Sequence, residues 1–380
     1  MLNGSKMPSR QTRSRSRASS NKSSRSRSKS RTSQKTVRVM TYNCRAFFDR
    51  YLERGPFLGE TIAKQKPDLV AIQEAMVNNA GLDSNIKVHL EKKSKKTFTI
   101  MNDASTVTYL KNHGVPTKFP WVVAKIFVLI INTQMLLLKI PGLAWLTASM
   151  PLMLEIAREA LGNLTNKFFG KKFDLFDWYY VSLAPFFGVS QIISNEFALK
   201  EYDVISLEPD LNKDHLGTCQ RALISDREGN DLFWFVNIHY VHFSTEQGAQ
   251  DRLGECERVL NWMEKAYKES KCNRGILLGD HNTLLENEPL IKACEMKGYV
   301  SAFKACNGAE PKSTWPSGIQ SIFMDLDGLD INPQGACLDY IWLKNLTAVR
   351  SELVGDECKK GDKTLYASDH VGIWADVVMP

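Results

Sequence analysis

Polar side chains suited to acid–base or metal chemistry stand at the ends of six strand-like segments of this chain. One segment, "ILLGDHN" at residues 276–282, is an apolar run that ends in a carboxylate, an imidazole and an amide. The full set is Asn43, Glu74, His239, Asp280 with Asn282, Asp339, and Asp369 with His370. One such residue is typical of a turn or a solvated loop. Six positions in one chain favour the rim of an active site.

Strands interleaved with helices must position these residues. The predicted strands are β-branched or apolar runs that end near the polar groups, at residues 37–44, 69–72, 230–243, 276–280, 337–345 and 371–379. Residues 246–269 have apolar side chains at helical spacing, which puts Leu253, Cys256, Val259, Leu260 and Met263 on one face. This pattern predicts an α/β or α+β domain large enough for an enzyme.

Six short motifs carry a resemblance to a known family. They are "TYNC" (41–44), "PDLVAIQEA" (67–75), "VNIHY" (236–240), "LLGDHN" (277–282), "LDYIW" (338–342) and "SDHVGIW" (368–374). In this order they resemble the exonuclease-endonuclease-phosphatase superfamily, which has the fold of pancreatic deoxyribonuclease. The resemblance covers residues 37–112 and about 187–380. It implies an α+β fold, a four-layer sandwich of two mainly antiparallel β-sheets flanked by helices, with the site at one edge.

The resemblance also implies a metal-dependent phosphoric ester hydrolase. A phosphodiester is anionic and resists attack by water, so its site must supply a cation, a base and hydrogen-bond donors. Mg²⁺ is the expected ion, with Mn²⁺ as the second candidate. Its ligands and their support would come from Glu74, Asn43 and Asp369, because Mg²⁺ prefers oxygen ligands and usually binds through one or two carboxylates.

The same resemblance assigns the catalytic roles. Asp280 would orient and deprotonate the attacking water, and Asn282 would hold that water and a phosphoryl oxygen. His239 and His370 would donate to phosphate oxygens, with Asp339 keeping the His370 ring oriented and charged. The general base stays open between Asp280 and His370.

One residue of the central motif departs from the family pattern. Position 281 is usually apolar there, and here it is His281. Its place in an alternating strand end predicts a packed ring that points away from Asp280 and Asn282.

Residues 113–187 form a large hydrophobic insertion in the predicted fold. Two uncharged runs, Ile126–Leu138 and Ile140–Leu154, hold 13 and 15 residues. As helices they would be about 20 and 22 Å long, short of the ~30 Å hydrocarbon layer. Both ends return to one domain, so a monotopic hairpin or interfacial helices fit better than a single span. We expect contact with a membrane surface, with an internal subdomain or protein-binding patch as the alternative.

The basic charge of the chain lies in its first 36 residues. This Ser/Arg-rich tail holds seven Arg, four Lys and no acid, a charge of +11, whereas the whole chain is +7, so the remainder is −4. The tail has too few apolar residues to offset its ordering entropy and is predicted to be disordered. It is a candidate for binding anionic lipid or nucleic acid. The catalytic domain is expected at 37–380.

Cysteine usage and the start of the chain bear on localisation. The eight cysteines form no C-x-x-C pair, and the basic tail has no apolar signal core. We therefore expect free thiols and an intracellular, non-secreted protein associated with membranes peripherally or monotopically.

The predicted substrate is a membrane phospholipid cut on its headgroup side, as in the neutral sphingomyelinases. That preference depends on the apolar insertion. The alternatives are a nucleic-acid phosphodiesterase, endonuclease or exonuclease, and an inositol phosphate phosphatase. The net acidic body counts against the first alternative, and "CLDYIW" in place of a Cys-Asp-Arg-Ile type motif counts against the second.

Overall fold

The computed structural model describes residues 35–45, 50–77, 81–103, 187–207, 217–284, 288–318 and 335–380, and residues 35–380 form one compact unit. The predicted tail (1–36) and the predicted insertion (113–187) lie outside the described residues, except for residues 35, 36 and 187. Among the described residues, no helix is both long enough and apolar enough to cross a membrane.

The first of two six-stranded sheets has the strand order β11-β12-β1-β2-β4-β3. Its strands are β1 (Thr36–Asn43), β2 (Leu69–Met76), β3 (Phe98–Asp103), β4 (Phe187–Ser194), β11 (Ala348–Val354) and β12 (Gly372–Val378). Only the β1–β2 pair within it is parallel.

The second sheet has the order β5-β6-β7-β8-β10-β9. Its strands are β5 (Ala198–Ser206), β6 (Thr218–Ser225), β7 (Asp231–His239), β8 (Gly275–Asp280), β9 (Tyr299–Ser301) and β10 (Asp339–Lys344). Here only β7 and β8 run parallel. Each sheet is therefore mainly antiparallel with one parallel pair near its middle.

Alternation along the strands builds a core on both faces of each sheet. In β1, Val37 and Val39 point into a buried cluster that joins the two sheets, whereas Met40 and Tyr42 belong to a cluster on the outer face. Successive strand residues point to opposite faces, so a strand covered on both sides must be apolar at nearly every position.

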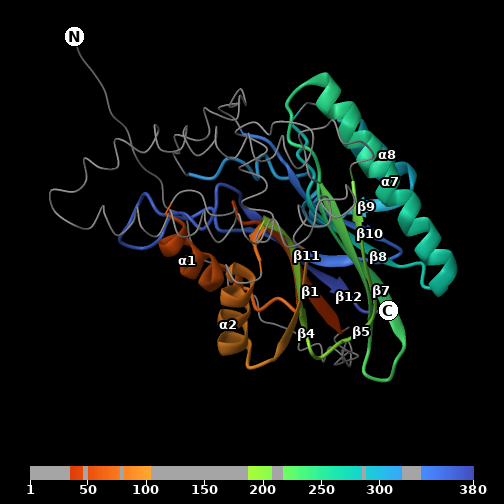
Figure 1. Cartoon of the computed structure of the whole chain (residues 1–380), viewed down its shortest axis with the longest axis horizontal. Helices are drawn as coiled ribbons and strands as arrows, with labels where there is room; N and C mark the ends of the chain where they lie inside the picture. The colour runs from red at the N-terminus through yellow and green to blue at the C-terminus, as the bar shows by residue number, and fades with distance from the viewer. Residues whose placement is uncertain are drawn as a thin grey trace, which may run out of the picture. The chain divides into compact units, whose positions relative to one another are not determined.

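Helices cover the outer faces of both sheets (Figure 1). Helices α1 (Tyr51–Lys64) and α2 (Leu82–Ser94) pack on the first sheet. Helices α7 (Glu246–Ser270) and α8 (Pro289–Met296) pack on the second, and the short α9 (Ala302–Asn307) follows β9. The four layers confirm the predicted α+β sandwich.

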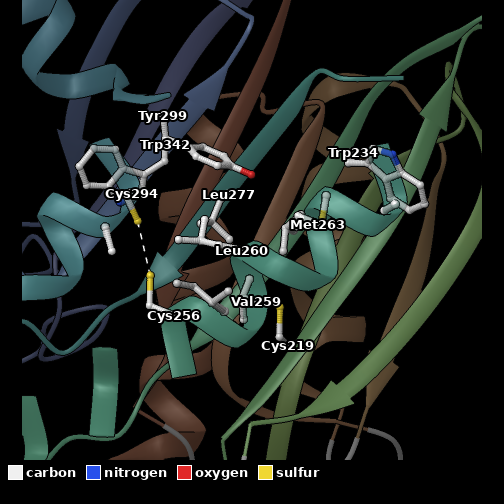
Figure 2. Packing of buried hydrophobic residues seen from close by; sticks show 14 of the residues in the cluster. Cys219, Trp234, Cys256, Val259, Leu260, Met263, Leu277, Cys294, Tyr299 and Trp342 are labelled. Carbon is white, nitrogen blue, oxygen red and sulfur yellow. Dashed lines mark hydrogen bonds between the residues drawn. The ribbon is translucent and has the colours of Figure 1, made fainter. Parts of the chain in front are cut away.

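Helix α7 buries the predicted apolar face against the second sheet (Figure 2). Cys256, Val259, Leu260 and Met263 are fully or almost fully buried, and Leu253 is partly buried. Thr245 caps the helix by accepting a hydrogen bond from Gly248 N at 3.0 Å. All eight cysteines are free thiols, as expected, with Cys256 and Cys294 side by side at 3.7 Å between their sulfur atoms.

Candidate active site

Strand direction brings the predicted site residues to one edge of the sandwich. The parallel β1 and β2 pair Asn43 with Gln73, next to Glu74, and the parallel β7 and β8 pair His239 with Asp280. Parallel strands end at the same edge of a sheet, so each pair presents its terminal polar groups together. The antiparallel β10 begins at that edge, where Asp339 lies opposite Asp280.

A local irregularity in β2 redirects Glu74. The pairing of β2 with β4 shifts register between Ile72 and Ala75, and Glu74 has a left-handed backbone with φ 46°. A non-glycine residue in this region is strained, and bulges of this kind re-aim a side chain. The Glu74 side chain keeps 24% exposure, whereas that of Asp280 has 1%.

Asn43 joins two carboxylates that come from different sheets. Its Nδ2 donates to Glu74 Oε1 at 3.0 Å and to Asp280 Oδ2 at 2.8 Å. Its Oδ1 accepts from Arg45 N at 2.9 Å, which fixes the orientation of the amide. Asn43 therefore presents donors to the carboxylates in this structure, whereas the sequence prediction had its oxygen as a metal ligand.

Two histidines flank this carboxylate pair. His239 Nε2 lies 3.9 Å from Glu74 Oε1 and 3.8 Å from Asp280 Oδ2. His370 Nε2 lies 3.7 Å from Asp280 Oδ2, and its Nδ1 is 2.9 Å from Asp339 Oδ2. Asp280 thus stands between two imidazoles, at the centre of the site.

The environment separates the protonation states of the two histidines. Burial lowers the pKa of His239 to about 3, and the neighbouring His242 and His370 add to this effect. Burial also opposes charge on His370, but the carboxylates of Asp339 and Asp280 outweigh it and raise the pKa of His370 to about 10. At neutral pH the site therefore holds one neutral imidazole and one imidazolium.

Asp280 has the properties of a proton acceptor. Burial, aided by the Asp339 carboxylate, raises its pKa to about 7, although His370 and the Asn43 hydrogen bond act in the opposite direction. A base is most effective when its pKa is near the working pH. Asn282 sits beside it with φ 50°, donating its backbone N–H to Asp280 Oδ1 at 2.8 Å and its Nδ2 to Tyr240 O at 2.8 Å.

Asp369 is held by two buried side chains, Arg45 and Trp315. Arg45 Nη1 forms an ion pair with Asp369 Oδ2, which also accepts from Trp315 Nε1 at 3.2 Å. Burial disfavours its charge, but His370 and Arg45 outweigh burial and lower its pKa. The charge of Asp369 also helps to raise the pKa of Glu74, after the larger effect of burial.

Sequence reasoning missed Arg45 and Trp315. Arg45 directly follows the "TYNC" motif, and Trp315 lies in the segment "STWPSG". Both residues are therefore in or beside segments that contain polar or aromatic side chains. Neither shows periodicity that would reveal its contact, because Arg45 and Asp369 are 324 positions apart. Both side chains are buried, Arg45 at 6% and Trp315 at 5% exposure.

His281 is buried away from the catalytic groups. Its ring lies 5.4 Å from Tyr240, 5.1 Å from Tyr340 and 6.5 Å from Trp342 between centroids. Its Nδ1 is 3.0 Å from Gly279 O, and burial lowers its pKa to about 3. The ring has the packed position that the sequence predicted.

The donor set fits a divalent cation. Glu74, His239 and Asp280 offer ligand atoms that all lie within 4.8 Å of one another, and so do Asp280, Asp339 and His370. Asp339 Oδ1 is buried without a hydrogen-bond partner among the described residues. The raised pKa values of Glu74 and Asp280 reflect buried negative charge that a cation would stabilise. Carboxylate oxygens favour Mg²⁺ or Mn²⁺, while the imidazole favours Mn²⁺ over Mg²⁺.

Two mixed sheets in this order, with a polar site at their shared edge, have the fold of the exonuclease-endonuclease-phosphatase superfamily, as the sequence predicted. Solved structures agree. The endonuclease/exonuclease/phosphatase from Bacteroides vulgatus is 12% identical, with a TM-score of 0.52, 91% of this chain and 100% of that chain covered. The mannosyl-6-phosphatase of Bacteroides thetaiotaomicron is 12% identical, with a TM-score of 0.53 and coverages of 90% and 99%.

A third similar structure is that of D. rerio TDP2 complexed with a single-strand DNA product. It is 14% identical, with a TM-score of 0.52, and the match covers 90% of this chain and 98% of that chain. No protein-family model and no curated protein matches the sequence. At these identities the likeness establishes the fold. The predicted closeness to neutral sphingomyelinases stays a prediction.

Proposed function

We propose that this chain is a divalent-metal-dependent phosphoric ester hydrolase that acts on phosphodiesters of single-stranded nucleic acid. The observation that carries the chemistry is the central carboxylate Asp280, which lies between a neutral and a charged imidazole and is joined to Glu74 by Asn43. These are the base, donors and cation ligands that hydrolysis of an anionic ester needs.

Each residue of the site has its own role in the proposed hydrolysis. Glu74 would hold the cation, with His239 in reach as a second ligand, and the cation would neutralise charge on the phosphate. Asp280, with its pKa near 7, takes the proton of the attacking water. The charged His370 donates to a phosphoryl oxygen and cannot act as the general base while it is protonated. Of the two general bases that the sequence left open, Asp280 is therefore favoured.

The remaining side chains position these groups. Asp339 holds the His370 ring through Nδ1 at 2.9 Å and stabilises its charge. Neutral His239 offers either a metal ligand or a donor to the phosphate at Nε2. Arg45 and Trp315 fix Asp369 next to His370. Asn282 holds the Asp280 carboxylate through its backbone N–H and binds the Tyr240 carbonyl through Nδ2.

The substrate class is supported by the fold neighbour that holds a single-strand DNA product. The +11 tail supplies positive charge for a phosphate backbone, which the net −4 remainder of the chain lacks. The lipid substrate and the membrane association stay predictions from the sequence, because they depend on the insertion at residues 113–187, of which only residue 187 is described. The intracellular localisation also stays a prediction.

A substrate panel tests the proposal. Purified full-length protein is incubated with single- and double-stranded oligonucleotides, mannose 6-phosphate, soluble inositol phosphates, and sphingomyelin or phosphatidylcholine vesicles, each with Mg²⁺ or Mn²⁺ and with chelator. We expect metal-dependent cleavage of the single strand. Release of phosphocholine from vesicles without strand cleavage would overturn the substrate class. Turnover that persists in chelator would overturn the metal dependence.

A further inference from the structure

Hydrogen bonds fix the backbone of the loop between β7 and α7, which begins at the active-site edge. It begins directly after His239, and the Tyr240 carbonyl accepts from Asn282 Nδ2 at 2.8 Å. Val241 N donates to Glu255 Oε2 at 2.9 Å. A loop whose backbone groups are bound by buried side chains holds its own side chains in place.

A buried ion pair fixes the outer part of the same loop. Arg252 of α7 donates from Nη1 to Val241 O at 3.2 Å and to Phe243 O at 2.7 Å. Its other donors bind Glu288, and the two side chains have 0% and 1% exposure. Glu288 precedes α8, so the pair ties the loop after β7 to the segment that follows Asp280 and Asn282 along the chain.

Helix α7 approaches this loop so closely that a Cβ atom does not fit at position 248. A Cβ atom at Gly248 would lie 2.2 Å from Phe243 O, so only glycine permits the contact. The backbone of Phe243 is therefore held by Arg252 on one side and by the first turn of α7 on the other.

The ring of Phe243 nevertheless faces solvent. It is 39% exposed, and its centroid lies 4.7 Å from that of His242 at an interplanar angle of 42°. His242 is near enough to His239 to help lower the pKa of that residue, after burial. His242 and Phe243 follow His239 by three and four positions, in a loop that begins at the active-site edge.

No apolar patch surrounds this ring among the described residues. The other exposed large apolar side chains there lie on α2, α8, β9 and β11, namely Val88, Met296, Val300 and Val349. Phe243 is followed by Ser244, Thr245 and Glu246. A membrane-inserting surface gathers several apolar residues with basic ones, whereas a single rigid ring suits the flat face of one planar group.

We infer that the exposed ring of Phe243, backed by His242, forms an aromatic platform that stacks on the nucleobase next to the scissile phosphate of a single-stranded substrate. The inference rests on the proposed function and adds the residues that hold the base. Stacking is tolerant of sequence because every base has a flat face. The platform therefore favours an unpaired base but does not distinguish one base from another.

The test compares binding and cleavage in the full-length chain. Phe243→Ala should weaken binding of a 2-aminopurine-labelled single strand in chelator by about 5-fold to about 100-fold and reduce fluorescence quenching of the label. Phe243→Trp should restore both. Met296→Ala removes a side chain with 84% exposure on α8 and should change neither.

Cleavage assays separate the inference from the proposed function. The loss caused by Phe243→Ala should be at least about 5-fold larger on a strand with normal bases than on one with abasic sites flanking the scissile phosphate. Equal losses of cleavage on both strands would contradict the stacking platform without contradicting the proposed hydrolase activity. Weaker vesicle binding with unchanged strand binding would overturn it in favour of a membrane contact. An inactive wild-type protein with every strand would overturn the proposed function itself.

Discussion

His281 should make the protein lose stability as the pH falls below about 6.5. In the folded state its ring is fully buried among aromatic side chains and its pKa is lowered to about 3, while the ordinary value is 6.5. The unfolded chain therefore binds a proton that the folded chain does not. Stability is unaffected above the unfolded pKa and decreases as pH falls from there toward the folded value.

The loss of folding stability at pH 5.5 depends almost only on the pKa of His281 in the unfolded chain. One pH unit below 6.5, protonation of the unfolded chain destabilises the fold by about 1.4 kcal/mol, since each pKa unit corresponds to about 1.36 kcal/mol. The folded value does not affect this figure as long as it stays well below 5.5. At pH 7.5 the effect is about 0.1 kcal/mol.

Urea unfolding of the wild type and of His281→Leu at both pH values measures this effect. The wild type should lose about 1.3 kcal/mol more than His281→Leu between pH 7.5 and pH 5.5. Tyr340→Phe alters the same aromatic cluster without removing a group that titrates in this range, so its stability difference from wild type should be the same at both pH values. Equal pH slopes for wild type and His281→Leu would refute the buried, neutral ring.

Three further predictions concern the Arg252–Glu288 ion pair, the metal site and the strand β8 that carries Asp280. Arg252→Met should cost about 3–5 kcal/mol in urea unfolding because it removes the ion-pair partner of the buried Glu288, and adding Glu288→Leu should recover part of that; a loss below about 1 kcal/mol would contradict the buried pair. Mn²⁺ at 100 times its dissociation constant should raise wild-type stability by about 2.7 kcal/mol, and Glu74→Gln should remove most of this gain at the same concentration. Gly279→Ala should cost more than about 3 kcal/mol because its Cβ would lie 2.0 Å from a β7 carbonyl oxygen. Gly229→Ala, also at positive φ but with nothing within 4 Å, should cost only about 1 kcal/mol.

The sequence predicted the features that depend on local pattern. Strand alternation located β1, β7, β8, β10 and β12, and helical spacing located the buried face of α7. Because polar groups at strand ends mark a sheet edge, the same pattern also found the residues that the structure brings together around Asp280.

Features that depend on contacts between distant segments were not predictable. The orientation of the Asn43 amide is decided by Arg45 N and two carboxylates, one of them 237 positions away. The Arg252–Glu288 pair spans 36 positions and joins helix α7 to the residue before α8, which no periodicity relates. The left-handed backbone of Glu74 follows from a register shift against β4, which the sequence of β2 alone does not show.

The rate of single-strand cleavage in the Glu74→Ala, Asp280→Ala and His370→Ala variants tests the central claim most directly. Each variant should be folded by circular dichroism and should cleave the strand at least ~10²-fold more slowly than wild type in Mg²⁺ or Mn²⁺. Glu257→Ala, which removes an exposed carboxylate from α7, should keep the wild-type rate. Wild-type turnover in all three folded site variants would contradict the assignment of hydrolysis to this edge of the sandwich.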